Sequence, residues 1–142
     1  MITIDTAIEI DASPAEVWAV LADTDAYPDW NPHFPEIDGE LEPDADLVLH
    51  VEREGAEPRS LDATVTGFEP ERRLEWTATI LSRWLFRGRH FFELEPLDGD
   101  RTRFHNRERI VGVAAQVSMR GDVERDYEAM NEALKRQVEA GH

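Results

Sequence analysis

The sequence predicts an α+β fold with seven strands, two short helices after the first strand and one long C-terminal helix. Three observations predict it. Residues 2–10 alternate between apolar and polar side chains, as expected for a half-buried strand. Residues 36–112 contain six strand-like segments separated by turn signals. Residues 117–140 then repeat apolar side chains at helical spacing.

Two short helices are expected directly after the first strand. Ser13-Pro14-Ala15-Glu16 has the pattern of a capping box with proline at the first helical position, which predicts a helix that ends near Asp23. One further helical turn is expected near residues 25–27. The following stretch, YPDWNPHFPEIDG at 27–39, contains three prolines and is too rich in proline for a long helix or a central strand.

The middle of the chain is expected to form a run of strands. In residues 72–80 the side chains Leu74, Trp76, Ala78 and Ile80 alternate with more polar ones, which is typical of a strand with one buried face. The C-terminal helix is expected to bury Val123, Tyr127, Met130, Leu134 and Val138. The predicted strands cover about 36–41, 46–54, 59–68, 72–80, 86–96 and 101–112.

The turn at Asp98-Gly99 determines which side chains of the last two strands point inward. A two-residue loop would place apolar side chains opposite charged ones, so a three-residue loop, Leu97-Asp98-Gly99 with glycine in the left-handed conformation, is predicted. This register pairs residues 95 with 101 and 93 with 103 on the wet face. On the buried face it pairs Phe92 with Phe104 and His90 with Asn106.

Composition and charge exclude several classes of protein. The formal net charge is −16, with 31 acidic against 15 basic residues, so nucleic acid and anionic lipid surfaces are disfavoured partners. A cytoplasm at molar salt would explain this charge, and an ordinary acidic protein is the alternative. The sequence has no cysteine and no apolar run of membrane-spanning length. Its first residues lack the basic start and the apolar block that are typical of a signal peptide. We therefore expect one domain over residues 1–142, a cytoplasmic location and no stable membrane insertion.

The inner face of the last hairpin carries polar side chains among apolar ones. His90, Asn106 and Glu108 converge there, which is either a binding pocket with polar anchors or a set of groups that satisfy one another. Glu108 and His90 are also the candidates for acid–base chemistry, because burial can move either pKa toward neutrality. The five histidines show no pair at ligand spacing on one helix, and we expect neither a metal site nor a cofactor.

Five segments, in this order, resemble the START-like superfamily, also called SRPBCC. They are IEIDASPAEVWAVLADTDAYPDWNP, IDGEL, RRLEW, HFFELEPLDGDRTRFHNRERIVG and MNEALKRQVEA. The resemblance implies a helix-grip fold, in which a curved antiparallel sheet wraps around the C-terminal helix with a ligand cavity between them. It also implies that residues 27–34, YPDWNPHF, lie at one mouth of the cavity, where Trp30, Pro32 and Phe34 form a stiff aromatic rim. The expected ligand-binding set is Trp30, Phe34, Trp76, Trp84, Phe86, His90, Phe92, Phe104, Asn106, Glu108, Ile110, Tyr127 and Met130.

The leading function hypothesis is a binding or carrier protein for a small, largely apolar ligand, such as a lipid, a polyketide-like molecule or an aromatic compound. The alternative is a cyclase, dehydratase or hydrolase that uses Glu108 and His90 as acid and base. A protein-interaction domain that presents the aromatic rim ranks below both. The expected oligomeric state is a monomer or a weak homodimer.

Overall fold

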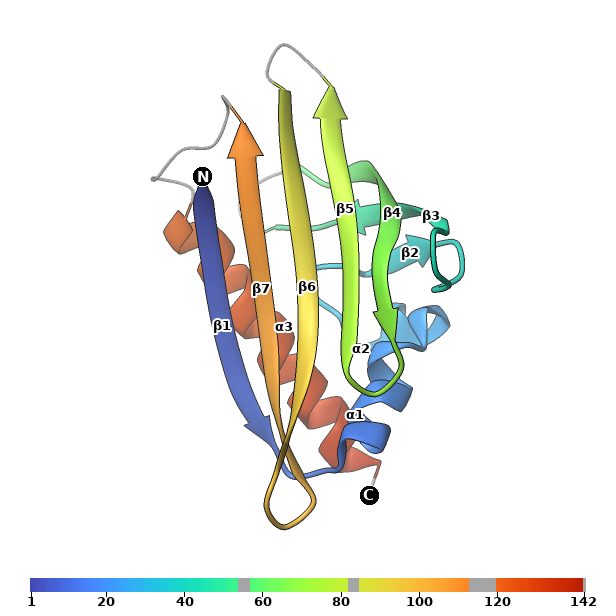
Figure 1. Cartoon of the computed structure of the whole chain (residues 1–142), viewed down its shortest axis with the longest axis vertical. Coiled ribbons are helices and arrows are strands. Elements are labelled where there is room, and N and C mark those ends of the chain that lie inside the picture. Colours follow the sequence, from blue (N-terminus) through green and yellow to red (C-terminus); the bar gives the residue numbers. More distant parts are fainter. Residues whose placement is uncertain (54–56, 82–84, 113–119, 142) are drawn as a thin grey trace.

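The computed structural model describes residues 1–53, 57–81, 85–112 and 120–141, without the side chains of residues 80, 81, 85, 86 and 120. Figure 1 shows these elements in sequence colours. In chain order they are β1 (Ile2–Ile10), α1 (Pro14–Leu21), the 3-10 turn η1 (Thr24–Ala26), α2 (Tyr27–Trp30), β2 (Glu36–Asp38), β3 (Asp46–Val51), β4 (Arg59–Glu69), β5 (Arg73–Leu81), β6 (Leu85–Leu97), β7 (Arg101–Gly112) and α3 (Arg120–Ala140).

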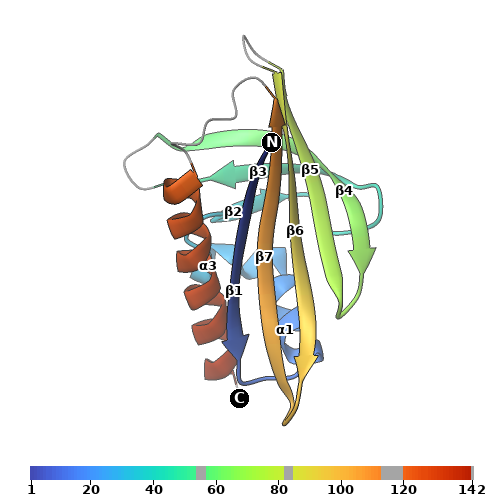
Figure 2. The ribbon, with the colours of Figure 1, turned by 60° about the vertical axis from the view of Figure 1, so that its left-hand side comes forward.

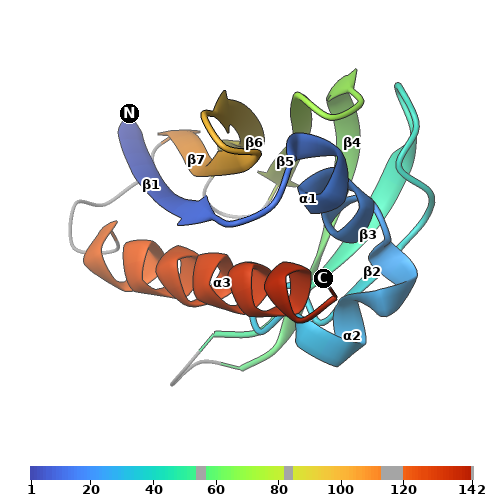
Figure 3. The same cartoon turned by 90° about the horizontal axis from the view of Figure 1, so that it is seen from below.

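The seven strands form one antiparallel sheet in the order β1-β7-β6-β5-β4-β3-β2. Helix α3 lies along the concave face of this curved sheet (Figure 2). Helices α1 and α2 lie beside the C-terminal end of α3 (Figure 3). The predicted helix-grip fold is confirmed. No helix in the described ranges is long and apolar enough to cross a membrane.

Strand β2 is shorter than predicted because of Gly39. The strand stops at Asp38, and Gly39 follows with φ of 110°, a conformation that other residues adopt only with strain. A Cβ atom at this position would also lie 2.7 Å from the backbone oxygen of Asp46. The chain therefore leaves the sheet at Gly39, and the predicted strand over 36–41 loses its second half.

The predicted capping box of α1 is present. The Glu16 backbone N–H donates to the Ser13 hydroxyl at 3.3 Å, and the Ser13 backbone N–H donates to the Glu16 carboxylate at 3.3 Å. These two bonds satisfy N–H groups that a helix start leaves without partners. The buried side of α1, with Val17 and Leu21, packs into the main core.

The register of the β6–β7 hairpin differs from the prediction. The loop has three residues, but they are Asp98, Gly99 and Asp100, so Leu97 pairs with Arg101 and Phe92 pairs with Asn106. Gly99 and Asp100 both have positive φ, 75° and 56°, and this conformation moves the turn one residue along the chain. Each predicted pair is therefore wrong by two positions. Because the shift is even, the inward and outward assignments are unchanged.

Buried and wet sides of the hairpin follow the predicted alternation. The predicted inner side chains Phe92, Leu94, Phe104 and Ile110 are 0 to 6% exposed. On the opposite face, arginines pair with carboxylates of neighbouring strands, as predicted for this face in general. The partners differ from the prediction: Arg101 and Arg103 both bind Glu9, and Arg103 also lies 3.5 Å from Glu95.

The apolar interior consists of two clusters. The main cluster fills the space between the sheet, α1, α2 and the C-terminal half of α3, and includes Trp76, Phe92 and Phe104. The second cluster, called here the upper cluster, lies at the N-terminal end of α3 and of β1. Its members are Ile2, Ile4, Ile110, Val123 and Tyr127.

Candidate functional site

A chain of hydrogen-bonded polar side chains, called here the polar layer, links β6, β7, α3 and β1. It consists of His90, Asn106, Asn131 and Thr6, all at most 7% exposed. His90 Nε2 lies 2.6 Å from Asn106 Oδ1, Asn106 donates to Asn131 at 2.9 Å, and Asn131 donates to the Thr6 hydroxyl at 2.9 Å. The Thr6 hydroxyl donates back to the Asn106 backbone oxygen at 2.8 Å. Every member is thereby paired, as buried polar groups require.

His90 is held neutral in this layer. Burial lowers its pKa to about 3, although the bond to Asn106 acts in the opposite direction. An imidazole with so low a pKa is a weak base at neutral pH. The candidate acid–base pair of the sequence therefore has one member, His90, that is better suited to structure than to proton transfer.

Glu108 is the second inward-facing candidate, and it lies next to the upper cluster. It is directly opposite Ile4 on β1 and opposite His90 on β6. The Tyr127 hydroxyl of α3 donates to its Oε1 atom. Burial raises the pKa of Glu108 to about 7, although this hydrogen bond lowers it. The side chain is still partly exposed, and in the described residues Oε2 has no hydrogen-bond partner.

Gly88 makes room for the Glu108 carboxyl group. A Cβ atom at Gly88 would lie 2.7 Å from Glu108 Oε2, a separation that real Cβ atoms do not show. Strand β6 thus carries its smallest residue where the carboxyl group approaches the backbone. Gly88 therefore provides the space that the carboxyl group occupies.

The aromatic side chains expected to line a cavity pack against one another below the polar layer. The Trp76 and Phe92 ring centroids are 5.2 Å apart, and the Phe92 and Phe104 rings stack at 5.7 Å. Met130 is fully buried beside them. Of the described members of the predicted lining set, only Ile110 and Tyr127 belong to the upper cluster, next to Glu108.

The predicted aromatic rim separates into three parts. Phe34 is 3% exposed and lies inside the main cluster, where the centroids of its ring and of the Trp76 ring are 5.3 Å apart. Trp30 is half-buried and packs edge-on against Tyr27, and its Nε1 atom has no partner among the described residues. Pro32 is exposed and borders a cleft described below. Trp84 and the side chain of Phe86 lie outside the described residues.

A cleft of about 310 Å³ opens between the 32–33 and 52–53 segments and helix α3. Arg53 and Asp126 form an ion pair across it, with Arg53 Nε 2.8 Å from Asp126 Oδ2. The buried His33 ring also borders the cleft, and it contacts the Tyr127 ring at 5.2 Å. Tyr127 thus contacts both His33, a residue of this cleft, and the Glu108 carboxyl group.

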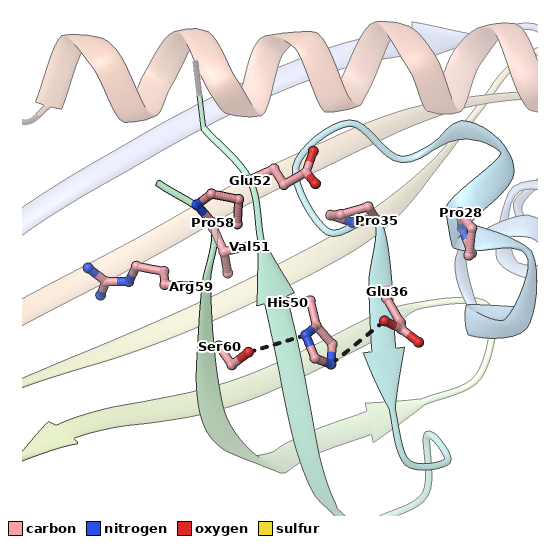
Figure 4. A pocket seen from close by; sticks show the side chains of 9 residues that line it. All are labelled: Pro28, Pro35, Glu36, His50, Val51, Glu52, Pro58, Arg59 and Ser60. Carbon is pink, nitrogen blue, oxygen red and sulfur yellow. Dashed lines mark hydrogen bonds and ion pairs between the residues drawn. The ribbon is translucent and has the colours of Figure 1, made fainter. Parts of the chain in front are cut away.

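A larger surface cleft, of about 530 Å³, is lined by residues of β2, β3 and β4, among them Glu36, His50 and Ser60 (Figure 4). At its edge Glu36, Asp38 and His50 have ligand atoms within 4.8 Å of one another, and they are the one group in the described chain that could hold a metal ion. His50 already bonds Asp38 at 2.9 Å and Ser60 at 3.2 Å. The hydrogen bond to Asp38 raises the pKa of His50, so ion pairing accounts for the group.

Several site residues were missed in the sequence. Asn131 follows Tyr127 by four positions on the buried side of α3, a spacing that could have identified it. Thr6 is the one polar side chain on the inner face of β1 and could have been found in the same way. Arg53 and Asp126 gave no signal, because nothing in the sequence shows that the 52–53 segment meets α3.

Comparisons with known proteins agree on the fold. The family model described as polyketide cyclase/dehydrase and lipid transport matches residues 1–139. The structure of the Zhui aromatase/cyclase from Streptomyces sp. R1128 is similar at 20% identity and a TM-score of 0.79, covering 97% of this chain and 93% of that one. A START superfamily protein from Mycobacterium smegmatis is similar at 18% identity and a TM-score of 0.80, covering 99% of both chains. Among curated proteins, none matches.

Proposed function

Because this chain belongs to the polyketide cyclase/dehydrase and lipid transport family, we propose that it binds and carries a small, largely apolar ligand. The ligand is a lipid, a polyketide-like molecule or an aromatic compound. Its place is between the sheet and the N-terminal half of α3, above the polar layer. Glu108 and Tyr127 are its polar anchors, and the upper cluster contacts its apolar body.

The observation that carries this proposal is the position of the Glu108 carboxyl group. It is enclosed enough to hold its pKa near 7, yet Oε2 has no partner in the described residues. Apolar side chains of the upper cluster adjoin it. An apolar wall with one or two placed polar groups is the usual composition of a small-molecule site.

The test compares two tryptophan substitutions at neighbouring positions of β7. Ile110→Trp places a large side chain on the inner face, where Ile110 is 6% exposed, and Val111→Trp places it on the outer face, where Val111 is 51% exposed. Binding of 2-methylnaphthalene is measured by equilibrium dialysis, and copurifying small molecules are identified by mass spectrometry. We expect binding to be lost in Ile110→Trp and kept in Val111→Trp.

Equal binding by both variants would place the ligand elsewhere and refute the proposal. Circular dichroism shows whether Ile110→Trp remains folded. If it does not, Glu108→Gln takes its place. For this variant the ligand is 2,6-dihydroxynaphthalene, because 2-methylnaphthalene has no group that can hydrogen-bond to Glu108. We expect its binding to weaken by about 1–3 kcal/mol, the range for a lost buried hydrogen bond.

A second candidate function, acid–base catalysis, is favoured by the same carboxyl group. A carboxylic acid with a pKa of about 7 is matched to proton transfer at neutral pH. Glu108 would be the acid or base, with Tyr127 as its hydrogen-bond partner, and His90 would have only a structural role. In this case Glu108→Gln should leave ligand binding nearly unchanged and reduce turnover by about 10²–10⁴-fold.

We also propose that the chain acts in the cytoplasm as a single domain, in the form of a monomer or a weak homodimer. The net charge of −16 supports the monomer or weak homodimer, because like charges on two copies oppose their association. Sedimentation velocity at low and at molar salt would measure the oligomeric state. A stable dimer at low salt would contradict this part of the proposal.

A further inference from the structure

The cleft beside His33 is lined by a histidine, three charged side chains and two apolar ones. Its volume of about 310 Å³ is enough for one end of a small ligand. The lining residues are Pro32, His33, Glu52, Arg53, Asp126 and Ala129. Neither the leading function hypothesis nor its alternative assigned a role to this cleft.

His33 lines this cleft and has a buried ring nitrogen without a hydrogen-bond partner. The residue is 6% exposed, and the unpartnered atom among the described residues is Nδ1. Burial lowers the pKa of His33 to about 4, so the ring is neutral at pH 7. The backbone of Glu52 acts in the opposite direction and raises this pKa, as an acceptor does for a ring N–H. We assign that N–H to Nε2, because Nδ1 has no partner among the described residues. In a neutral imidazole that donates through Nε2, Nδ1 is an acceptor.

Arg53 provides donors to the same cleft. Its Nε atom is bonded to Asp126, while in the described part of the chain its two terminal nitrogens have no hydrogen-bond partner. The carboxylates of Glu52 and Asp126 also line the cleft, and the net charge is −16. A ligand carboxylate would be repelled by both, and it has no hydrogen to donate to His33.

We propose that this cleft binds a neutral hydroxyl group at the polar end of the ligand. The hydroxyl hydrogen donates to His33 Nδ1, and the hydroxyl oxygen accepts an N–H from Arg53. A hydroxyl group is suited to both roles because it carries one donor and two acceptor lone pairs. The inference rests on the proposed function and narrows the ligand to a phenol or alcohol with an apolar body, in preference to a fatty acid.

The position of Tyr127 connects this cleft with the rest of the ligand site. Its ring contacts the His33 ring at 5.2 Å, and its hydroxyl donates to Glu108. A ligand whose hydroxyl group lies at His33 can therefore extend along Tyr127 toward Glu108 and the upper cluster. One molecule would then contact both parts of the site.

The test uses two ligands of equal shape, 2-naphthol and 2-methylnaphthalene, which differ only in a hydroxyl or methyl group. Their dissociation constants are measured by equilibrium dialysis for the wild-type protein and for His33→Phe, which keeps an aromatic ring and removes the acceptor. His105→Phe, on the outer face of the sheet, is the matched control. We expect the preference for 2-naphthol over 2-methylnaphthalene to fall about five- to tenfold in His33→Phe and to stay unchanged in His105→Phe.

Two outcomes would overturn the inference, and they can be told apart. If both ligands bind and the preference is the same in His33→Phe, the hydroxyl site is wrong and the proposed function stands. If neither ligand binds the wild-type protein, the proposed function fails together with the inference. Should His33→Phe not fold, Arg53→Met and the ¹⁵N resonance of His33 Nδ1 replace it. That resonance should move on addition of 2-naphthol and not of 2-methylnaphthalene.

Discussion

The Glu108 carboxyl group should make the protein less stable as the pH rises toward neutrality. Its pKa is raised from the ordinary value of 4.5 to about 7 in the folded state. Between these values the folded protein binds more protons at this group than the unfolded protein does, so the free energy of unfolding falls with pH. At about 1.4 kcal/mol for each pH unit, the ionised carboxylate costs the folded state about 3 kcal/mol above pH 7.

Glu108→Gln removes this titration and keeps a side chain of the same shape. Urea unfolding of both proteins is measured in steps from pH 4 to pH 8, at one salt concentration. We expect the wild type to lose about 3 kcal/mol relative to Glu108→Gln across this range, with most of the loss between pH 4.5 and pH 7. Glu42→Gln, at an exposed position of the β2–β3 loop, is the control and should run parallel to the wild type.

The difference between the two proteins isolates Glu108 from the buried histidines. Burial lowers the pKa of His33 to about 4 and that of His90 to about 3, so each makes the folded state more stable as the pH rises toward 6.5. Both histidines are present in both proteins, and their contributions cancel. A difference that stays constant from pH 4 to pH 8 would show that Glu108 titrates as an exposed carboxylate, and the reasoning would be wrong.

Three further predictions follow from packing and charge. Phe104→Ala should cost about 3–5 kcal/mol in urea unfolding, because Phe104 is 0% exposed and stacks on Phe92; a cost below about 2 kcal/mol would instead indicate an open cavity wall. Gly88→Ala should displace the Glu108 carboxyl group and weaken 2-methylnaphthalene binding, whereas adding it to Glu108→Ala should have no further effect; equal losses in both backgrounds would contradict the contact. The melting temperature should rise between low and molar KCl, because salt screens the repulsion between the carboxylates that give the net charge of −16. A melting temperature that stays flat or falls would contradict the interpretation that this charge is suited to a cytoplasm at molar salt.

The sequence was sufficient for the fold because alternation and helical spacing report burial directly. Leu74 and Trp76 point inward as their period of two predicts, and the capping box of Ser13 and Glu16 marks the start of α1. The hairpin register was wrong because it depends on the conformation of Asp98–Asp100, and two consecutive residues with positive φ leave little trace in sequence. The inner face survived this error because the shift was even.

The candidate site was only partly predictable. Glu108 and His90 could be placed on the inner face by alternation, but their different environments could not be foreseen. Asn106 bonds to His90 and Tyr127 bonds to Glu108, and these contacts depend on where α3 crosses the sheet. The cleft depends on a meeting of Arg53 with Asp126, which are 73 residues apart. Spacing along the chain carries no information about such a contact.

The polar layer separates the apolar interior into two parts, the main cluster and the upper cluster. Most of the large side chains lie below it, so the free energy of folding is concentrated away from the proposed ligand site. Among the described residues the upper cluster has five members, against twenty buried residues in the main cluster, so it contributes the smaller share of the apolar core. Exchanging Ile4 or Val123 for other apolar side chains would change the proposed binding surface and leave the main cluster as it is. A scaffold built in this way can acquire new ligands through exchanges that keep the volume of the upper cluster, because exchanges of this kind cost little stability.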